Sequence, residues 1–386
     1  MTLPPSRLDV GAILTDPATR IIVTCGSGGV GKTTIAAALA LRAAESGRRT
    51  VVLTIDPARR LAQSMGLVEL DNTPRAVTDA KGDLFAMMLD MKRTFDEVVS
   101  AHATPERAEQ IFANPFYQAL SSSFAGTQEY MAMEKLSQLA QHSEWDLIVV
   151  DTPPSRSALD FLDAPQRLGR FLDGRMIRLL AMPARTGGRA YVKIVTAGFS
   201  VFAKVLSRIL GGELLSDVSA FVNALETMFG GFRQRAENTY QLLKAPGTAF
   251  LVVAAPEPDA LREASYFIDR LSDDQMPLSG AVINRVHITA APPNGKPALT
   301  AARAQDAADL LTEQPANQAC NLAESALRVH AELAQLAHHE ARMTRRFAAA
   351  HPSVPLVTVN ALPTDVHDLA GLRRIGDLMA AGCTAR

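Results

Sequence analysis

A glycine-rich loop between an expected strand and an expected helix constrains this chain more than any other feature. The apolar run Ile21–Cys25 ends in glycines, and from Lys32 the sequence changes to the helix-forming run Ile35–Leu41. Residues Gly26–Thr33 fit the pattern G-x-x-x-x-G-K-[ST]. In a loop of this kind, backbone amides turn towards an anion at the positive end of a helix. The stretch therefore predicts that the chain binds a nucleoside triphosphate.

The residues of this loop have expected parts in phosphate and metal binding. The Lys32 ammonium would reach the terminal phosphates, and the Thr33 hydroxyl would bind Mg²⁺. The expected nucleotide contacts form one continuous run, which is Gly28, Gly29, Val30, Gly31, Lys32, Thr33 and Thr34.

Strands alternate with helices along most of the chain, which predicts an α/β fold with a doubly wound, mostly parallel sheet. Strands are expected at residues 50–55, 84–90, 146–151, 249–255, 278–284 and 354–359. Helical patterns interrupt the alternation at residues 91–125 and 165–245. We expect these two stretches to be insertions that form a helical subdomain within one domain of residues 1–386.

Two acidic residues follow expected strands at the edge where ligands bind in parallel sheets. Asp151 ends the apolar run from residue 146, where a carboxylate would hold Mg²⁺. Asp56 follows the strand at residues 50–55 and precedes Pro57. An Asp-Pro pair is also an ordinary helix start, with Asp as the N-cap, so a capping role for Asp56 stays open.

Composition excludes several other classes. The formal net charge of −1 gives no overall attraction to nucleic acid. The three cysteines, Cys25, Cys320 and Cys383, have no metal-binding spacing and fit a reducing cytoplasm. The N-terminus lacks the apolar core of a signal peptide, and no apolar run of 18 residues occurs. A cytoplasmic chain, peripheral to a membrane at most, is expected.

The second helical stretch is markedly basic in its first half. Between Arg167 and Arg208 there are nine Lys and Arg residues against the single acid Asp173. This pattern fits a solvated helix face as well as it fits a membrane-surface or partner-binding segment. If it binds a partner, its apolar face should be partly exposed or line a groove, and that face consists of Phe199, Phe202, Leu206 and Ile209.

Several motifs together resemble one known family. Residues Gly26–Thr34 resemble the deviant phosphate loop G-K-G-G-V-G-K-T of the SIMIBI-class ATPases. Residues Asp56–Ala58 resemble the first switch, D-P-A-H, of the arsenite-pump and tail-anchored-protein targeting ATPases, and Asp151–Ser155 resemble their second switch, D-T-A-P-T-G. Asn284, which could otherwise simply cap the turn after its strand, matches the family's adenine-contacting asparagine. The residues around Pro355 and Asp365 resemble the C-terminal loop that covers the adenine.

The resemblance implies a nucleotide-driven dimer with ATP and Mg²⁺ at the subunit interface. Asp56 would orient the attacking water, Lys32 would bind the phosphates, and Asp151 would serve Mg²⁺. Closing of the switches would move the helical insertions, which in the targeting ATPases form the groove for a membrane-protein client. The resemblance thus implies a cytoplasmic ATPase that handles a membrane-related client.

Departures from the family pattern keep alternatives open. Ser27 stands where the family has its signature lysine, which crosses the dimer interface to the partner's phosphates. Pro154–Ser157 replace the usual residues of the second switch. The cysteines that bridge some relatives through zinc, or bind arsenite, are absent. One alternative is an anion-pump subunit, and another is a weakly hydrolysing half of a heterodimer with a related subunit. A third is a DNA-partition ATPase, which the near-neutral net charge of the chain does not support.

Overall fold

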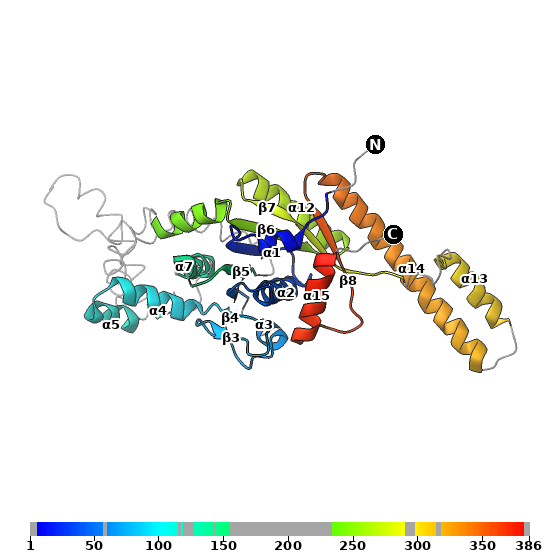
Figure 1. Ribbon diagram of the computed structural model, residues 1–386, viewed down its shortest axis with the longest axis horizontal. Coiled ribbons are helices and arrows are strands. Elements are labelled where there is room, and N and C mark those ends of the chain that lie inside the picture. The colour runs from blue at the N-terminus through cyan, green and yellow to red at the C-terminus, as the bar shows by residue number, and fades with distance from the viewer. Residues whose placement is uncertain are drawn as a thin grey trace, which may run out of the picture. The chain divides into compact units, whose positions relative to one another are not determined.

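The computed structural model describes residues 6–56, 60–114, 117–118, 127–141, 144–153, 234–289, 298–313 and 318–381 (Figure 1). The chain divides into two compact units. The first comprises Met1–Met87, Glu144–Ala158 and Leu243–Arg386. The second comprises Met88–Ser143 and Leu159–Leu242.

The first unit is built on an eight-stranded sheet with the order β3-β4-β2-β5-β1-β6-β7-β8. The neighbours from β2 through β8 pair in parallel, and β3 is antiparallel to β4. This arrangement confirms the predicted α/β fold. The strands are β1 (Ile21–Cys25), β2 (Thr50–Thr54), β3 (Arg75–Ala76), β4 (Leu84–Met88), β5 (Leu147–Asp151), β6 (Thr248–Ala254), β7 (Leu278–Val286) and β8 (Leu356–Asn360).

The central strands are continuous apolar runs because both faces of the sheet are covered. Every residue of β1, β2, β5 and β6 is buried. Strands of a parallel sheet have this composition, rich in valine, isoleucine and leucine, because helices cover both of its faces. The buried core thus holds the strand ends in a fixed register, for example Thr24 of β1 opposite Asp151 of β5.

Helices cover the sheet in the doubly wound manner. α2 (Lys32–Glu45) connects β1 to β2 and contacts β1, β2 and β5, while α15 (Leu369–Ala381) packs on α2 and β8. α12 (Pro258–Asp273) connects β6 to β7 and contacts both strands. These two connections lead towards opposite edges of the sheet, so right-handed crossovers place α2 and α12 on opposite faces. Two short helices, α1 (Val10–Thr15) and α3 (Arg60–Ser64), complete this layer arrangement.

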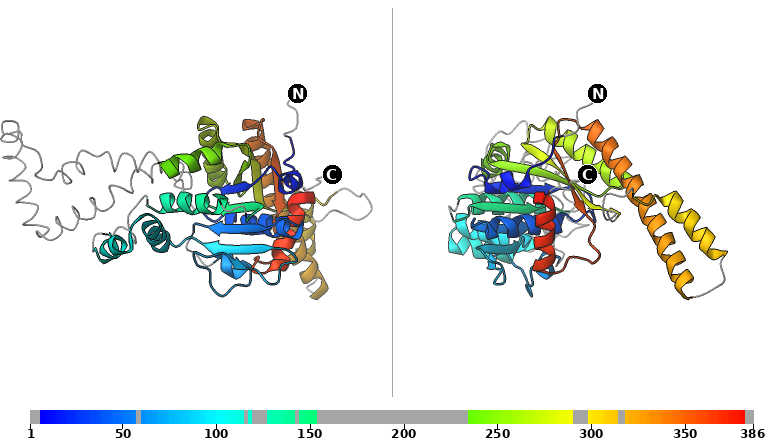
Figure 2. Two further views of the ribbon diagram at one scale, coloured as in Figure 1. Left: turned by 60° about the vertical axis from the view of Figure 1, so that its left-hand side comes forward. Right: turned by 45° about the vertical axis from the view of Figure 1, so that its right-hand side comes forward.

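Between β7 and β8 the chain forms a helical hairpin. α13 (Ala301–Thr312) lies beside the long helix α14 (Gln318–Ala350), as both views of Figure 2 show. The C-terminal half of α14 is tied to the sheet layer. Glu340 accepts hydrogen bonds from the His287 backbone N–H at 2.7 Å and contacts Nδ1 of the same residue at 2.8 Å. His351 Nε2 lies 2.8 Å from Ser265 Oγ in α12.

The described part of the second unit is helical. It contains α4 (Met91–His102), α5 (Pro105–Ala113), α7 (Thr127–Gln141) and the helical residues 234–242. Lys135 pairs with Glu97 at 3.0 Å, and Arg235 pairs with the buried Glu134 at 2.9 Å. The largely buried pair of Arg235 and Glu134 requires both partners, because one partner alone would leave an uncompensated charge. Met131 and Met133 are buried, so these methionines belong to a core.

The basic half of the second insertion and its apolar face lie outside the described residues, as do Phe199, Phe202, Leu206 and Ile209. Within the residues that the structure describes, no helix is long and apolar enough to cross a membrane.

The close approach of β1 and β6 generates a first prediction. A Cβ on Gly26, where φ is +151°, would lie 2.1 Å from the Val253 carbonyl oxygen. Gly47 has φ of +95° but no atom within 4 Å of the same position. Gly47→Ala should therefore cost about 1 kcal/mol for backbone strain. Gly26→Ala should cost about 2 kcal/mol more, because the backbone of β6 must shift. Urea unfolding of both variants measures the difference, and equal midpoints would contradict this packing argument.

Candidate nucleotide-binding site

The predicted site residues lie where the parallel strands end. β1 leads into the glycine loop, β2 into Asp56, and β5 ends in Asp151. β7 carries Asn284 near its end, and the segment after β8 carries Asp365. In doubly wound sheets, ligands bind at the carboxyl edge, where connections to the two sides of the sheet diverge. The neighbours β1 and β6 are such a point here.

Two neighbouring cavities occupy this edge. The larger, of about 400 Å³, is lined by residues of the glycine loop and by residues that follow β2, β5 and β8, including Lys32, Asp56 and Thr152. The smaller, of about 320 Å³, is lined by Asn284, His287 and the segment that follows β8. The residues that line both cavities are Thr34, Arg285, Asp365 and Val366. The geometry offers a polar cavity over the loop and a second cavity beside it.

The glycine loop leads into the start of α2 at the larger cavity. Gly31 is the N-cap of α2, with φ of +89° and no side-chain cap hydrogen bond. A Cβ at Gly31 would lie 2.4 Å from Asn284 Nδ2, so glycine is required there. Asn284 Nδ2 donates to the Val30 carbonyl at 2.9 Å. The first amides of α2 are thus available to an anion, as in other phosphate-binding helix starts.

Lys32 is buried at the base of the loop. Its Nζ donates to the Ser27 carbonyl oxygen at 2.8 Å. Burial lowers the pKa of Lys32, and the nearby carboxylates, with Asp151 the strongest, act against that shift. The ammonium therefore lies within the loop and beside the acidic end of β5.

Asp151 is fully buried and joins three elements. Its Oδ2 accepts hydrogen bonds from Thr33 Oγ1 at 2.8 Å and from Thr54 Oγ1 at 3.0 Å. Its Oδ1 is buried without a hydrogen-bond partner among the described residues. A buried acceptor requires a partner, and carboxylate and hydroxyl oxygens suit Mg²⁺. Thr33 and Asp151 therefore fit the metal predicted for this site.

Asp56 lies at the other side of the larger cavity. Its backbone N–H donates to Thr54 Oγ1 at 3.3 Å, and the side chain is partly exposed. The same Thr54 hydroxyl contacts Asp151, so β2 positions both carboxylates. This places Asp56 where a polar ligand over the loop would meet it.

Most predicted site residues come together here, whereas Pro355 does not. Pro355 precedes β8, and its carbonyl accepts from the Ala281 N–H of β7 at 2.9 Å. It therefore lies at the amino end of a parallel strand, away from the carboxyl edge. Val30 contributes its carbonyl, Gly28 is exposed on the loop, and the predicted residues that line the cavities are Gly29, Gly31, Lys32, Thr33, Thr34, Asp56, Asn284 and Asp365.

Sequence reasoning missed several residues of the site. Thr54 holds Asp151, and Arg60, Arg285 and His367 line the larger cavity. A usable signal existed for two of them, because Arg60 lies in the segment after Asp56 and Arg285 directly follows Asn284. No pattern marked Thr54, which reads as an ordinary residue of a buried strand.

The family of this chain follows from its sequence similarity to known proteins. The model of the anion-transporting ATPases matches residues 19–313. This chain belongs to that family. The ATPase GET3 of Podospora anserina is 25% identical over 283 residues, which cover 71% of this chain and 75% of the relative. The ATPase ARSA2 of Chlamydomonas reinhardtii is 28% identical over 263 residues, covering 68% and 66%. The ATPase GET3A of Arabidopsis thaliana is 26% identical over 275 residues, covering 71% and 69%.

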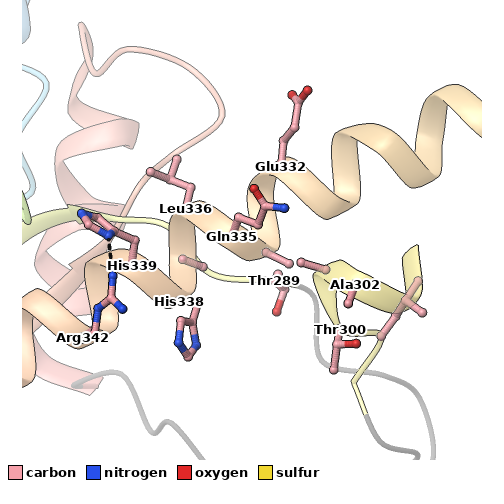
Figure 3. Close-up of a pocket in the computed structure, with 13 residues that line it drawn as sticks. Thr289, Thr300, Ala302, Glu332, Gln335, Leu336, His338, His339 and Arg342 are labelled. Carbon is pink, nitrogen blue, oxygen red and sulfur yellow. Dashed lines mark hydrogen bonds between the residues drawn. The ribbon is translucent and has the colours of Figure 1, made fainter. Parts of the chain in front are cut away.

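This anion-transporting ATPase family member has a further cavity that is separate from the loop. A groove of about 970 Å³ lies on the α13–α14 hairpin and is lined by residues such as Leu336, His338 and Thr300 (Figure 3). Both His338 and His339 are exposed, and His339 Nδ1 lies 3.0 Å from Arg342. Across the described residues no group of three or more metal-ligating side chains occurs.

The buried carboxylate generates a prediction about pH. Burial raises the pKa of Asp151 above its ordinary value, to about 6, although the Thr33 and Thr54 hydroxyls act in the opposite direction. The folded chain then keeps a proton that the unfolded chain releases between about pH 4 and pH 6. The free energy of unfolding of the nucleotide-free ATPase should therefore fall as the pH rises through this window.

Asp151→Asn removes the ionisable group, so this variant should not show the fall. Its free energy of unfolding at pH 7 should exceed that of the wild type by up to about 3 kcal/mol. Chemical unfolding of both proteins between pH 4 and pH 8 measures the effect. Asp83→Asn, at an exposed position before β4, is the matched control. Parallel pH profiles for the wild type and Asp151→Asn would show that Asp151 is not held as described.

Proposed function

We propose that this chain binds ATP with Mg²⁺ at the carboxyl edge of its sheet and hydrolyses it. Members of its family are ATPases. The observation that carries the proposal is the buried Asp151 carboxylate, which contacts Thr33 Oγ1 at 2.8 Å and keeps Oδ1 without a partner among the described residues. A hydroxyl at the start of α2 beside a strand-end carboxylate is the arrangement that P-loop enzymes use to hold Mg²⁺.

Each described group has a distinct part in this proposal. The amides of the glycine loop and the Lys32 ammonium bind the phosphates, and Asn284 and Asp365 border the smaller cavity that takes the base. Thr33 and Asp151 hold Mg²⁺, which supplies charge stabilisation to the transferred phosphoryl group when bound. Asp56 accepts a hydrogen bond from the attacking water and so orients it towards the terminal phosphate.

The client is proposed on the basis of the resemblance and of the relatives. The relatives include proteins named ATPase GET3 and ATPase ASNA1 homolog. We propose that the chain works in the cytoplasm, at the membrane periphery, on a membrane-protein client. The insertions predicted at residues 91–125 and 165–245 form the helical subdomain that contacts it. The second compact unit supports this division, because it combines segments from both stretches.

The roles of Lys32 and Asp56 are separable by measurement. Lys32→Ala should weaken ATP binding at least tenfold, because a charge-assisted hydrogen bond contributes about 2 kcal/mol. Asp56→Asn should leave ATP affinity within about threefold and lower kcat by about 10³-fold, since the group acts on the water. Asp83→Asn, away from both cavities, is the control. Hydrolysis at the wild-type rate by Asp56→Asn would leave helix capping as the role of Asp56.

A second candidate, a heterodimer with a related subunit, is favoured by Ser27. Its side chain is 8% exposed, and Oγ has no hydrogen-bond partner among the described residues. It is uncharged and too short to reach a partner's nucleotide. A homodimer would therefore lack the cation that the resemblance expects across the interface. A related subunit that keeps this lysine would complete the site formed here by Lys32, Asp56 and Asp151.

This candidate predicts slow hydrolysis by the chain alone, unless a nearby arginine of the same chain substitutes for the lysine. A trans cation of this kind raises phosphoryl-transfer rates by about 10³-fold or more. The measurement compares kcat of the isolated chain, of Ser27→Lys, and of the chain with a co-purifying relative. If the isolated chain is already as fast as the other two, no lysine-bearing partner is needed.

A further inference from the structure

The nucleotide site contains cations that the family resemblance did not predict. Lys32 is buried and already donates to the Ser27 carbonyl. Arg60 and Arg285 also line the larger cavity, as do Asp56 and Asp365. Of the two arginines, Arg285 has the defined geometry.

The backbone around Arg285 is distorted in a way that directs its side chain. Arg285 has φ of +60°, in the left-handed region that non-glycine residues seldom adopt. The pairing of β7 with β8 shifts register between Ile283 and Val286, so the strand is irregular at this point. Such irregularities re-aim side chains and recur beside active sites, and their strain persists only where surrounding contacts impose it.

The side chain of Arg285 reaches the phosphate loop. Its Nη1 donates to the Gly29 carbonyl oxygen at 3.0 Å, across 256 residues of sequence. The residue is exposed, and it lines both the cavity over the loop and the cavity beside Asn284. A guanidinium group has five N–H donors in a planar fork that suits phosphate oxygens. The bond to Gly29 therefore leaves donors for a ligand at the junction of the two cavities.

We propose that Arg285 contacts the phosphates of bound ATP and supplies, from within the chain, the cation that Ser27 does not provide. This inference rests on the proposed function, because it assigns a residue to the same site. The Gly29 bond holds the guanidinium at the loop before the nucleotide arrives. When ATP is bound, the remaining donors stabilise the charge that develops on the phosphates during transfer.

The test distinguishes a role of the Arg285 charge in hydrolysis from mere support of the loop by its hydrogen bond to Gly29. Arg285→Gln keeps an amide that can donate to the Gly29 carbonyl but removes the charge, whereas Arg285→Lys keeps the charge. Arg285→Gln should lower kcat at least tenfold with the Kd for ATP changed less than threefold, and Arg285→Lys should recover part of the rate. Arg7→Gln is the matched control, because Arg7 is also exposed and also donates to backbone carbonyls, those of Ala380 and Ala381.

Four results would overturn the proposal. The first is hydrolysis by Arg285→Gln at the wild-type rate. The second is weakened binding of both ATP and ADP by Arg285→Gln at unchanged kcat, which a residue that only supports the loop would give. The third is equal loss of rate in both variants at position 285 with lowered unfolding midpoints, which is a structural effect. The fourth is loss of the rate in Arg60→Gln while Arg285→Gln keeps it. A wild-type chain that does not bind ATP would instead refute the proposed function, and calorimetry with ATP alone distinguishes that case.

Discussion

The buried Asp151 carboxylate is the group on which the arrangement of this site depends. Asp151 ends β5, and its carboxylate accepts hydrogen bonds from the hydroxyls of Thr33 at the start of α2 and Thr54 at the end of β2. One side chain thus links the phosphate loop to two strands. Its burial is unfavourable for a charge, as the raised pKa shows, and the cost falls on the folded state. Keeping such a group at a strand end lowers the stability of the fold, as is common where a local rule is broken at a functional site.

The other polar groups of the site also bind one another across the loop. Lys32 donates to the Ser27 carbonyl, Asn284 to the Val30 carbonyl, and Arg285 to the Gly29 carbonyl. These bonds satisfy three carbonyls of the loop. Under the proposed function, a nucleotide would meet a loop that these contacts already hold, so less binding energy would be spent on ordering it.

The sequence was sufficient for the sheet and for most of the site, because both follow from local patterns. Continuous apolar runs mark strands buried on both faces, and glycines before Lys32 mark the loop. Residues that depend on tertiary contacts were not predictable in this way. Pro355 was expected at the nucleotide, yet it lies at the amino end of β8, whereas the smaller cavity is lined by residues that end or follow this strand. α1 and α13 are short or alanine-rich and were not identified, and the register shift beside Arg285 has no local signal.

Ser27 in the loop and Arg285 on β7 both bear on the charge balance at the phosphates. A bound triphosphate carries more negative charge than one Mg²⁺ and Lys32 offset, and Asp56 and Asp365 add to the excess. Under the proposed function, an additional cation at the phosphates would come either from a partner subunit or from this chain. Ser27 cannot supply one, since its side chain is short and buried. Arg285 already lies against the loop on a strained backbone, so no ordering of a partner is required to place it. An internal cation would free the active site from dependence on a partner's lysine, and dimer closure could then serve the client rather than complete the phosphate site.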